Sequence, residues 1–197
     1  GASSGSVSLQ SPIVLVVNAA LVDSNVINVD TVVFAGSGQN ILTTAPGGAF
    51  GSYTYKSIRV AQTSGTATVG QATLNMTNDL VVSSGGLNLS GRQIAVTGNF
   101  RTEGSGSLIT NNVADSLGVG GNATFQGGIS NNMTAGIITI KGNFSQAGNA
   151  DAFAPSGSHR TRFDLPGSAT AQTISFANPT TSFFDSLHLD RGSGTRG

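Results

Sequence analysis

The sequence predicts an all-β protein, and within that class a right-handed parallel β-helix (β-solenoid) with coils of about 20–23 residues and little or no helix. Two observations lead to this prediction. A short apolar pattern recurs along the chain at a nearly constant spacing, and the composition is poor in charged and helix-forming residues. Both features are typical of repeated β-coils that stack along one axis.

The recurring pattern is clearest in IAVTGNF, residues 94–100, where apolar residues alternate with spacers before a turn and a further apolar residue. The first apolar residue of each copy is Leu74, Ile94, Leu117 or Ile138, so the copies begin about 20–23 residues apart. Alternation with period two predicts short strands, and the period near twenty predicts that successive strands pair in parallel.

The repeated apolar positions predict the core. One coil buries almost nothing alone, so at least three neighbours must stack to form a continuous apolar interior. The predicted core residues are Leu74, Ile94, Val96, Phe100, Leu117, Val119, Ile138, Ile140 and Phe144. A second apolar set follows a glycine-rich turn in each period, at Leu87, Leu89, Leu108, Ile109 and Ile129.

Asparagine also recurs at the turn before the last apolar residue of each copy. Asn tolerates a left-handed backbone, and its amide group can pass hydrogen bonds from one coil to the next. The sequence therefore predicts a turn ladder through Asn78, Asn99, Asn122 and Asn143.

Composition excludes several classes of protein. Charged residues make up 9% of the chain, against about 25% in a typical globular domain, and Glu103 is the single glutamate. The net charge is zero, which removes the electrostatic basis for binding nucleic acid or an anionic membrane. Cysteine is absent, so disulfides and thiolate metal sites are impossible. No apolar run reaches the ~18 residues of a membrane span, so none is expected.

Residues 1–30 form a first region, with a Gly/Ser lead and then a long apolar alternation. This alternation predicts a strand that starts or caps the solenoid, or that completes the sheet of a neighbouring subunit by strand addition. The candidate assembly strand comprises Val7, Leu9, Ile13, Leu15, Val17 and Leu21.

Residues 31–197 are predicted to form the solenoid with a 129-residue internal repeat, in which residues 31–66 resemble residues 160–195. Phe34 matches Phe163 and Val60 matches Leu189 among several coincidences at this offset. We interpret the repeat as a unit of roughly six coils. An uncapped last coil would expose strand edges and apolar side chains, so the expected partners are copies of the chain or flanking repeats of a longer chain.

Residues 155–176, PSGSHRTRFDLPGSATAQTISF, and residues 182–190, SFFDSLHLD, resemble the bacterial β-strand-repeat surface proteins. Those proteins chain coils of the VTGNF kind with a closing GxHTVxFxG…QTI…FxNLxI element, and the resemblance covers residues 31–195. It implies an exported, non-enzymatic fibre, stalk or adhesin-like segment at a bacterial cell surface. Arg160 and Arg162 stand where the pattern usually has apolar or neutral residues.

A carbohydrate-binding or polysaccharide-cleaving β-helix is the alternative, and its partners would be surface glycans. Cleavage needs acids gathered on one face, sometimes with Ca²⁺, and the nine acids are dispersed. The nearest cluster of titratable and charged residues is Asp185, His188, Asp190 and Arg191, with His159, Arg160 and Arg162 in the preceding segment. Alternation along the strand places His188 outward, so the cluster is expected to consist of solvated surface charges. No catalytic, cofactor-binding or metal-binding residue is therefore predicted, and no cofactor is expected.

Overall fold

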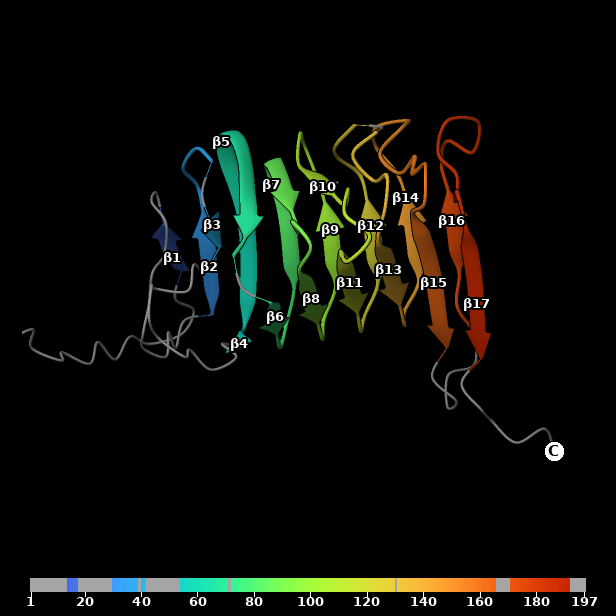
Figure 1. Ribbon diagram of the computed structural model, residues 1–197, viewed down its shortest axis with the longest axis horizontal. Helices are drawn as coiled ribbons and strands as arrows, with labels where there is room; N and C mark the ends of the chain where they lie inside the picture. Colours follow the sequence, from blue (N-terminus) through green and yellow to red (C-terminus); the bar gives the residue numbers. More distant parts are fainter. Residues whose placement is uncertain are drawn as a thin grey trace, which may run out of the picture.

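The structure, a computed structural model, describes residues 14–17, 30–38, 40–41, 54–70, 72–129, 131–165 and 171–191. These residues form strands and turns and contain no helix, so the predicted all-β class is confirmed. Because no helix is present in the described ranges, they hold no helix that could span a membrane. Parallel strands stack in about six turns of a β-solenoid, and Figure 1 shows them standing side by side along the long axis.

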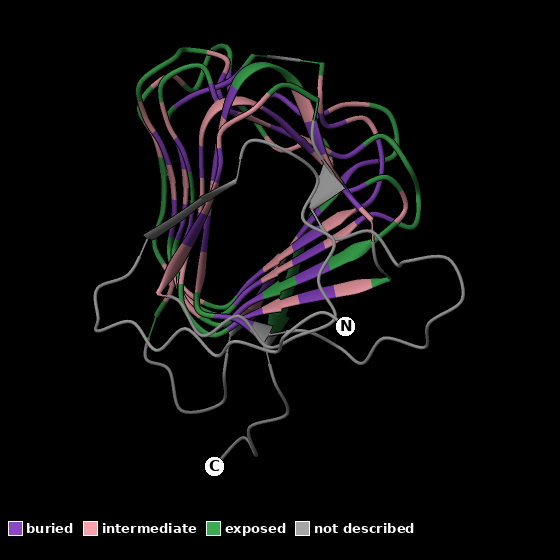
Figure 2. Ribbon diagram, turned by 90° about the vertical axis from the view of Figure 1, so that its left-hand side faces the viewer, coloured by how far each residue is buried: buried purple, intermediate pink, exposed green. Residues whose placement is uncertain are grey.

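Two sheets of parallel strands run the length of the molecule. The ten-stranded sheet contains β1 (Val14–Val17), β2 (Thr31–Phe34), β3 (Asn40–Ile41), β5 (Ser57–Val69), β7 (Leu80–Asn88), β9 (Phe100–Thr102), β10 (Ser107–Ile109), β12 (Ala123–Phe125), β14 (Phe144–Gln146) and β16 (Ile174–Phe176). The seven-stranded sheet contains β4 (Thr54–Tyr55), β6 (Thr73–Met76), β8 (Gln93–Val96), β11 (Ser116–Val119), β13 (Ile137–Ile140), β15 (Arg160–Leu165) and β17 (Leu187–Arg191). Seen along the axis, successive coils superimpose around a common interior (Figure 2).

The pairing register follows the sequence period. Leu74 pairs with Ile94, Ile94 with Leu117, and Leu117 with Ile138, so the predicted coil spacing is confirmed as a series of parallel strand pairs. Alternate side chains point inward because a strand has period two. Equivalent apolar residues therefore form continuous columns inside the solenoid.

A corner divides each of the long strands β5 and β7 into two parts. Their pairing shifts register between Val60 and Thr66, where Gly65 and Gly85 have φ angles of 76° and 69°. A Cβ at Gly85 would lie 2.5 Å from Cβ of Gln62, so glycine is needed there to bring the coils together. Beyond the corner β10 pairs with the second half of β7.

The second apolar set lies beyond this corner, with one exception. Leu87, Leu89 and Leu108 are buried and Ile109 is half-buried, whereas Ile129 is 64% exposed and the prediction for it is wrong. In the coil of Ile129, the residue that forms a β-bridge with Thr110 is Met133, further along the chain. The side chain of Met133 is therefore the one that is buried in this coil. The longer turn moves Ile129 outside the core.

All nine predicted core residues belong to the buried core. The interior of the later coils is aromatic. The rings of Phe125, Phe144 and Phe153 are fully buried, with Phe144 and Phe153 centroids 4.9 Å apart in an edge-to-face arrangement. Phe176 and Phe184 cover this cluster from the last described coil and are partly buried.

The predicted 129-residue offset relates two pairs of parallel strands. Val32 pairs with Ile58, and the equivalent residues Thr161 and Leu187 pair in the same way. However, the first pair lies in the ten-stranded sheet and the second in the seven-stranded sheet. Within the ten-stranded sheet, five successive strand pairs lead from Val32 on β2 to Phe144 on β14. Thr161, which the offset matches to Val32, lies on β15, the next strand along the chain, in the seven-stranded sheet. An offset of 129 residues thus spans five coils and part of another in this fold, close to the roughly six coils that the sequence predicts.

The N-terminal region contributes β1, which pairs in parallel with β2 and ends the order of the ten-stranded sheet. Leu15 and Val17 belong to this strand, opposite Val32 and Phe34. The candidate assembly-strand residues Val7, Leu9, Ile13 and Leu21 lie outside the described residues.

Candidate functional site

A column of side-chain oxygens joins the coils at the turn before β7, β9, β12, β14 and β16. Asp79 Oδ1 accepts the backbone N–H of Asn99 at 2.7 Å, and Asn99 Oδ1 accepts that of Asn122 at 2.9 Å. Asn122 Oδ1 accepts the N–H of Asn143 at 2.8 Å, and Asn143 Oδ1 accepts that of Thr173 at 2.8 Å. The column therefore connects five successive coils by the same bond.

The structure puts Asp79 rather than Asn78 in this column. Asn78 lies one residue earlier and is equivalent to Gly98 of the next coil. The backbone carbonyl oxygen of Asn78 accepts the Gly98 N–H at 3.0 Å. We define the turn ladder as Asp79, Asn99, Asn122 and Asn143. Each of these side chains accepts a backbone N–H from the next coil, so the ladder's chemistry is structural: it satisfies turn amides that no strand pairing reaches.

A buried carboxylate performs a similar task on another turn. Asp115 is fully buried; its Oδ1 accepts the Gly91 N–H at 2.5 Å, and its Oδ2 accepts those of Asn111 and Asn112, both at 2.9 Å. Gly91 belongs to the preceding coil, so Asp115 joins two coils. The sequence analysis missed this role, because an Asp in a turn usually binds the backbone two residues further on, whereas Asp115 binds amides that precede it in its own turn and in the preceding coil.

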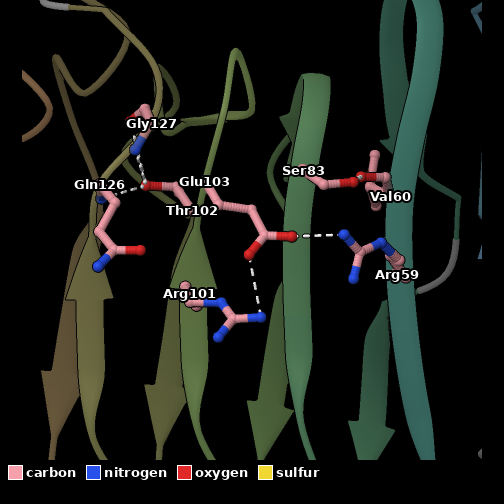
Figure 3. A network of polar contacts seen from close by, with 8 residues as sticks. All are labelled: Arg59, Val60, Ser83, Arg101, Thr102, Glu103, Gln126 and Gly127. Carbon is pink, nitrogen blue, oxygen red and sulfur yellow. Dashed lines mark hydrogen bonds and ion pairs between the residues drawn. The ribbon is translucent and has the colours of Figure 1, made fainter. Parts of the chain in front are cut away.

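Three charged side chains cluster on the outer surface of the ten-stranded sheet (Figure 3). Glu103 follows β9 and binds Arg101 at 3.0 Å; it also reaches across β7 to bind Arg59 on β5. These side chains are partly solvent-exposed. Exposed ion pairs contribute at most about 1 kcal/mol each, so the cluster is a minor stabiliser. With its carboxylate held by two guanidinium groups, Glu103 is a poor candidate for a general base.

The charged cluster that the sequence singled out lies on β15 and β17 and in the residues just before them. Arg162 donates a hydrogen bond to Asp190 Oδ2 at 2.7 Å, and both side chains are exposed. Arg160 and His188 line the same shallow hollow of about 280 Å³. The salt bridge occupies the carboxylate that would serve as a base, and the hollow is open to solvent, which fits the expectation of solvated surface charges.

Unlike these surface residues, His159 lies inside the solenoid. Its side chain is fully buried, and its Nδ1 lies 3.2 Å from Thr110 Oγ1 and 3.1 Å from the Ala135 carbonyl oxygen. Burial lowers the pKa of His159, because desolvation disfavours the charged ring; the hydrogen bond to Ala135 and the charge of Asp185 act in the opposite direction. A buried, neutral imidazole next to the Phe153 ring belongs to the core rather than to a reactive site.

The C-terminal end of the described solenoid exposes apolar side chains that occupy core positions. Ile174 on β16 pairs with the buried Phe144, and Leu187 and Leu189 on β17 pair with the buried Thr161 and Phe163. All three are nevertheless exposed, because within the described residues no strand pairs with the far side of β16 or β17. We call Ile174, Phe183, Leu187 and Leu189 the end face.

Within the described ranges, no group of three or more His, Asp or Glu side chains is placed to hold a metal ion. No family model, curated protein or solved structure matches the chain. The end face is thus the candidate functional site, since it is where the fold presents apolar surface and strand edges together.

Proposed function

We propose that the chain is a non-enzymatic structural segment of an extracellular bacterial fibre or cell-surface adhesin, in which β-coils stack end to end. The observation that carries this proposal is the pair of parallel sheets that end in exposed strands at the end face. Parallel strand edges and an apolar surface both favour the addition of another coil. The extracellular, bacterial setting rests on the likeness of residues 155–176 and 182–190 to surface-protein repeats.

The mechanism is mechanical. Each coil adds about 4.8 Å along the axis, the usual spacing between paired strands. Backbone hydrogen bonds and buried apolar columns link neighbouring coils, and the turn ladder joins five of them, so a pull along the axis is shared among several kinds of contact. A surface with few charges allows neighbouring copies to approach closely.

Negative-stain electron microscopy of the purified chain over a range of concentrations tests this proposal. We expect rods or filaments of constant width that lengthen with concentration. A Leu189→Asp variant should shorten them, because it places a charge on the end face, whereas Val113→Asp, on an equally exposed side chain away from that face, should not. Single particles at every concentration would contradict self-assembly.

Incubation with a panel of polysaccharides tests the non-enzymatic part of the proposal. We expect no release of reducing ends above the level of a boiled sample. Steady release that depends on protein concentration would support the cleaving alternative.

A further inference from the structure

The internal repeat places two equivalent strands in different surroundings. Strand β5 carries Ile58 and Val60, and the repeat matches them to Leu187 and Leu189 of β17. Ile58 and Val60 are 1% and 0% exposed, whereas Leu187 and Leu189 are 42% and 71% exposed. The same type of strand is therefore covered in one copy and open in the other.

Strands β5 and β17 have matching surroundings on the side that faces the preceding coil. Val32 and Phe34 pair with Ile58 and Val60, and their equivalents Thr161 and Phe163 pair with Leu187 and Leu189. All four residues of the preceding strands are buried. The difference in exposure thus arises on the other side alone, where β5 has a neighbour and β17 has none among the described residues.

That neighbour of β5 is β7, whose segment Leu80–Val81–Val82 supplies the cover. Leu80 pairs with Ile58 and Val82 with Val60, both buried, while Val81 lies opposite Arg59 on the outer surface. The cover is thus an apolar triplet whose first and third residues enter the core, with an uncharged middle residue outside.

On β17, the outward positions also suit an uncharged partner. His188 corresponds to Arg59 and Asp190 to Ala61, which pairs with Ser84. Asp190 is already bound by Arg162, so the outer surface of β17 offers no unpaired carboxylate to a new strand. An added strand with small or apolar outward residues leaves this ion pair intact.

We propose that the end face binds one further parallel β-coil, whose strand carries an apolar–uncharged–apolar triplet like Leu80–Val81–Val82 in register with Leu187–His188–Leu189. This proposal rests on the proposed function and specifies the chemistry of its contact. The occupant is a coil of the kind that residues 72–88 build, and it covers Leu187 and Leu189 as β7 covers β5.

An extended chain tests the proposal. The repeat matches Gly197 to Thr68, so a second copy of residues 69–146 appended after Gly197 continues the repeat in register. Hydrogen exchange of the amides of residues 187–191 is then compared with that of the unextended chain. We expect exchange at these amides to slow at least tenfold, and the binding of an apolar dye to fall.

The matched control carries Leu80→Asp and Val82→Asp in the appended copy alone. Because the original coils are untouched, the solenoid keeps its own core, but the cover now presents carboxylates to the end face. We expect no slowing of exchange at residues 187–191. Equal slowing in the control and the extended chain would overturn the proposed chemistry, and so would unchanged exchange in the extended chain.

A second measurement does not depend on folding of the extension. Exchange at residues 187–191 is followed in the unextended chain as its concentration rises, together with particle length by electron microscopy. Filaments with protected residues 187–191 support the proposal, with a second copy as the source of the coil. Filaments in which these amides stay fast overturn it while leaving self-assembly intact. Protection in the extended chain without filaments supports the proposal and contradicts self-assembly.

Discussion

Asn122 and Asn143 are 21 residues apart, yet Asn122 Oδ1 accepts the backbone N–H of Asn143 at 2.8 Å. The same bond joins Asn99 to Asn122 across 23 residues at 2.9 Å. Coils of different length therefore meet in the same register at this turn. The extra residues of the longer coil are absorbed elsewhere, and the ladder position stays fixed.

Removing one ladder oxygen should destabilise the stack modestly. Asn122→Ala leaves the Asn143 N–H without its acceptor, and we expect a loss of about 0.5–1.5 kcal/mol in the free energy of unfolding measured with urea. Asn122→Asp keeps an acceptor, as Asp79 does in the first ladder position, and should lose less. Equal stability of Asn122→Ala and the parent would show that water replaces the ladder bond at no cost.

Glycine at position 106 should be required by the spacing of the coils. A Cβ added there would lie 2.0 Å from the Val82 carbonyl oxygen, in the backbone of the preceding coil, so the coils must move apart. We expect Gly106→Ala to cost about 1–3 kcal/mol in a thermal or urea unfolding experiment.

The matched substitution is Gly118→Ala on β11. Its added Cβ would find only the Ile94 carbonyl oxygen, at 3.9 Å, which is an ordinary contact. Because alanine restricts the unfolded chain more than glycine does, we expect a neutral effect or a gain of about 0.5–1 kcal/mol. Similar losses at both positions would refute the close approach of coils at Gly106.

The aromatic cluster should carry much of the stability of the later coils. Phe144 is 1% exposed and its ring lies 4.9 Å from Phe153 and 5.1 Å from Phe184 between centroids. We expect Phe144→Ala to cost about 3–5 kcal/mol, and Phe144→Asp to prevent folding because a buried carboxylate has no partner there.

Phe183→Ala serves as the control for this cluster, since Phe183 is 48% exposed on the end face. Its effect on unfolding should stay below about 1 kcal/mol, because little apolar area is lost from the core. A stable, folded Phe144→Asp protein, judged by circular dichroism and limited proteolysis, would refute the assignment of the core.

His159 should make stability depend on pH. Its pKa in the folded protein is lower than the ordinary value of 6.5, because burial disfavours the charged ring. The unfolded chain therefore binds the proton first as pH falls. The contribution to stability is complete above pH 6.5 and is lost as pH falls toward the lower folded-state pKa.

Urea unfolding at several values between pH 7.5 and about 5 measures this dependence. The parent should lose stability over this range more steeply than His159→Gln, while His188→Gln on the exposed surface should behave like the parent. If the stability of His159→Gln falls with pH as steeply as that of the parent, a group other than His159 causes the pH dependence.

The sequence predicted the fold because the signal was periodic. The steps from Leu74 to Ile138 reappear as strand pairs, since a solenoid converts sequence spacing directly into spatial neighbours. Errors arose at turns, where the period is irregular. Asn78 was assigned to the turn ladder, but the ladder position is the next residue, Asp79. Ile129 was assigned to the core, but the longer turn places Met133 there.

Features that depend on three-dimensional closure were beyond sequence reasoning. Asp115 binds amides of two coils, and the partner Gly91 is 24 residues away. The burial of His159 likewise depends on Thr110 and Ala135 from earlier coils. The 129-residue repeat stays a prediction from the sequence, and only the structure shows that this offset spans five coils and part of another, because its two ends lie in different sheets.

The central claim is that equivalent residues of successive coils lie in register along one axis. Because the chain has no cysteine, spin labels can be attached to cysteines introduced in pairs at outward positions of the ten-stranded sheet. Val81 and Ser175 are separated by four pairing steps, through Arg101, Thr124 and Ser145. Arg59 lies one further step away, opposite Val81.

Pulsed electron–electron double resonance then measures the distance between the two labels. At about 4.8 Å per strand, the pair Val81→Cys and Ser175→Cys should be about 19 Å apart, and Arg59→Cys with Ser175→Cys about 24 Å. A constant increment for each added coil is the result that the stacked register predicts. Distances that fail to rise with the number of coils would contradict it.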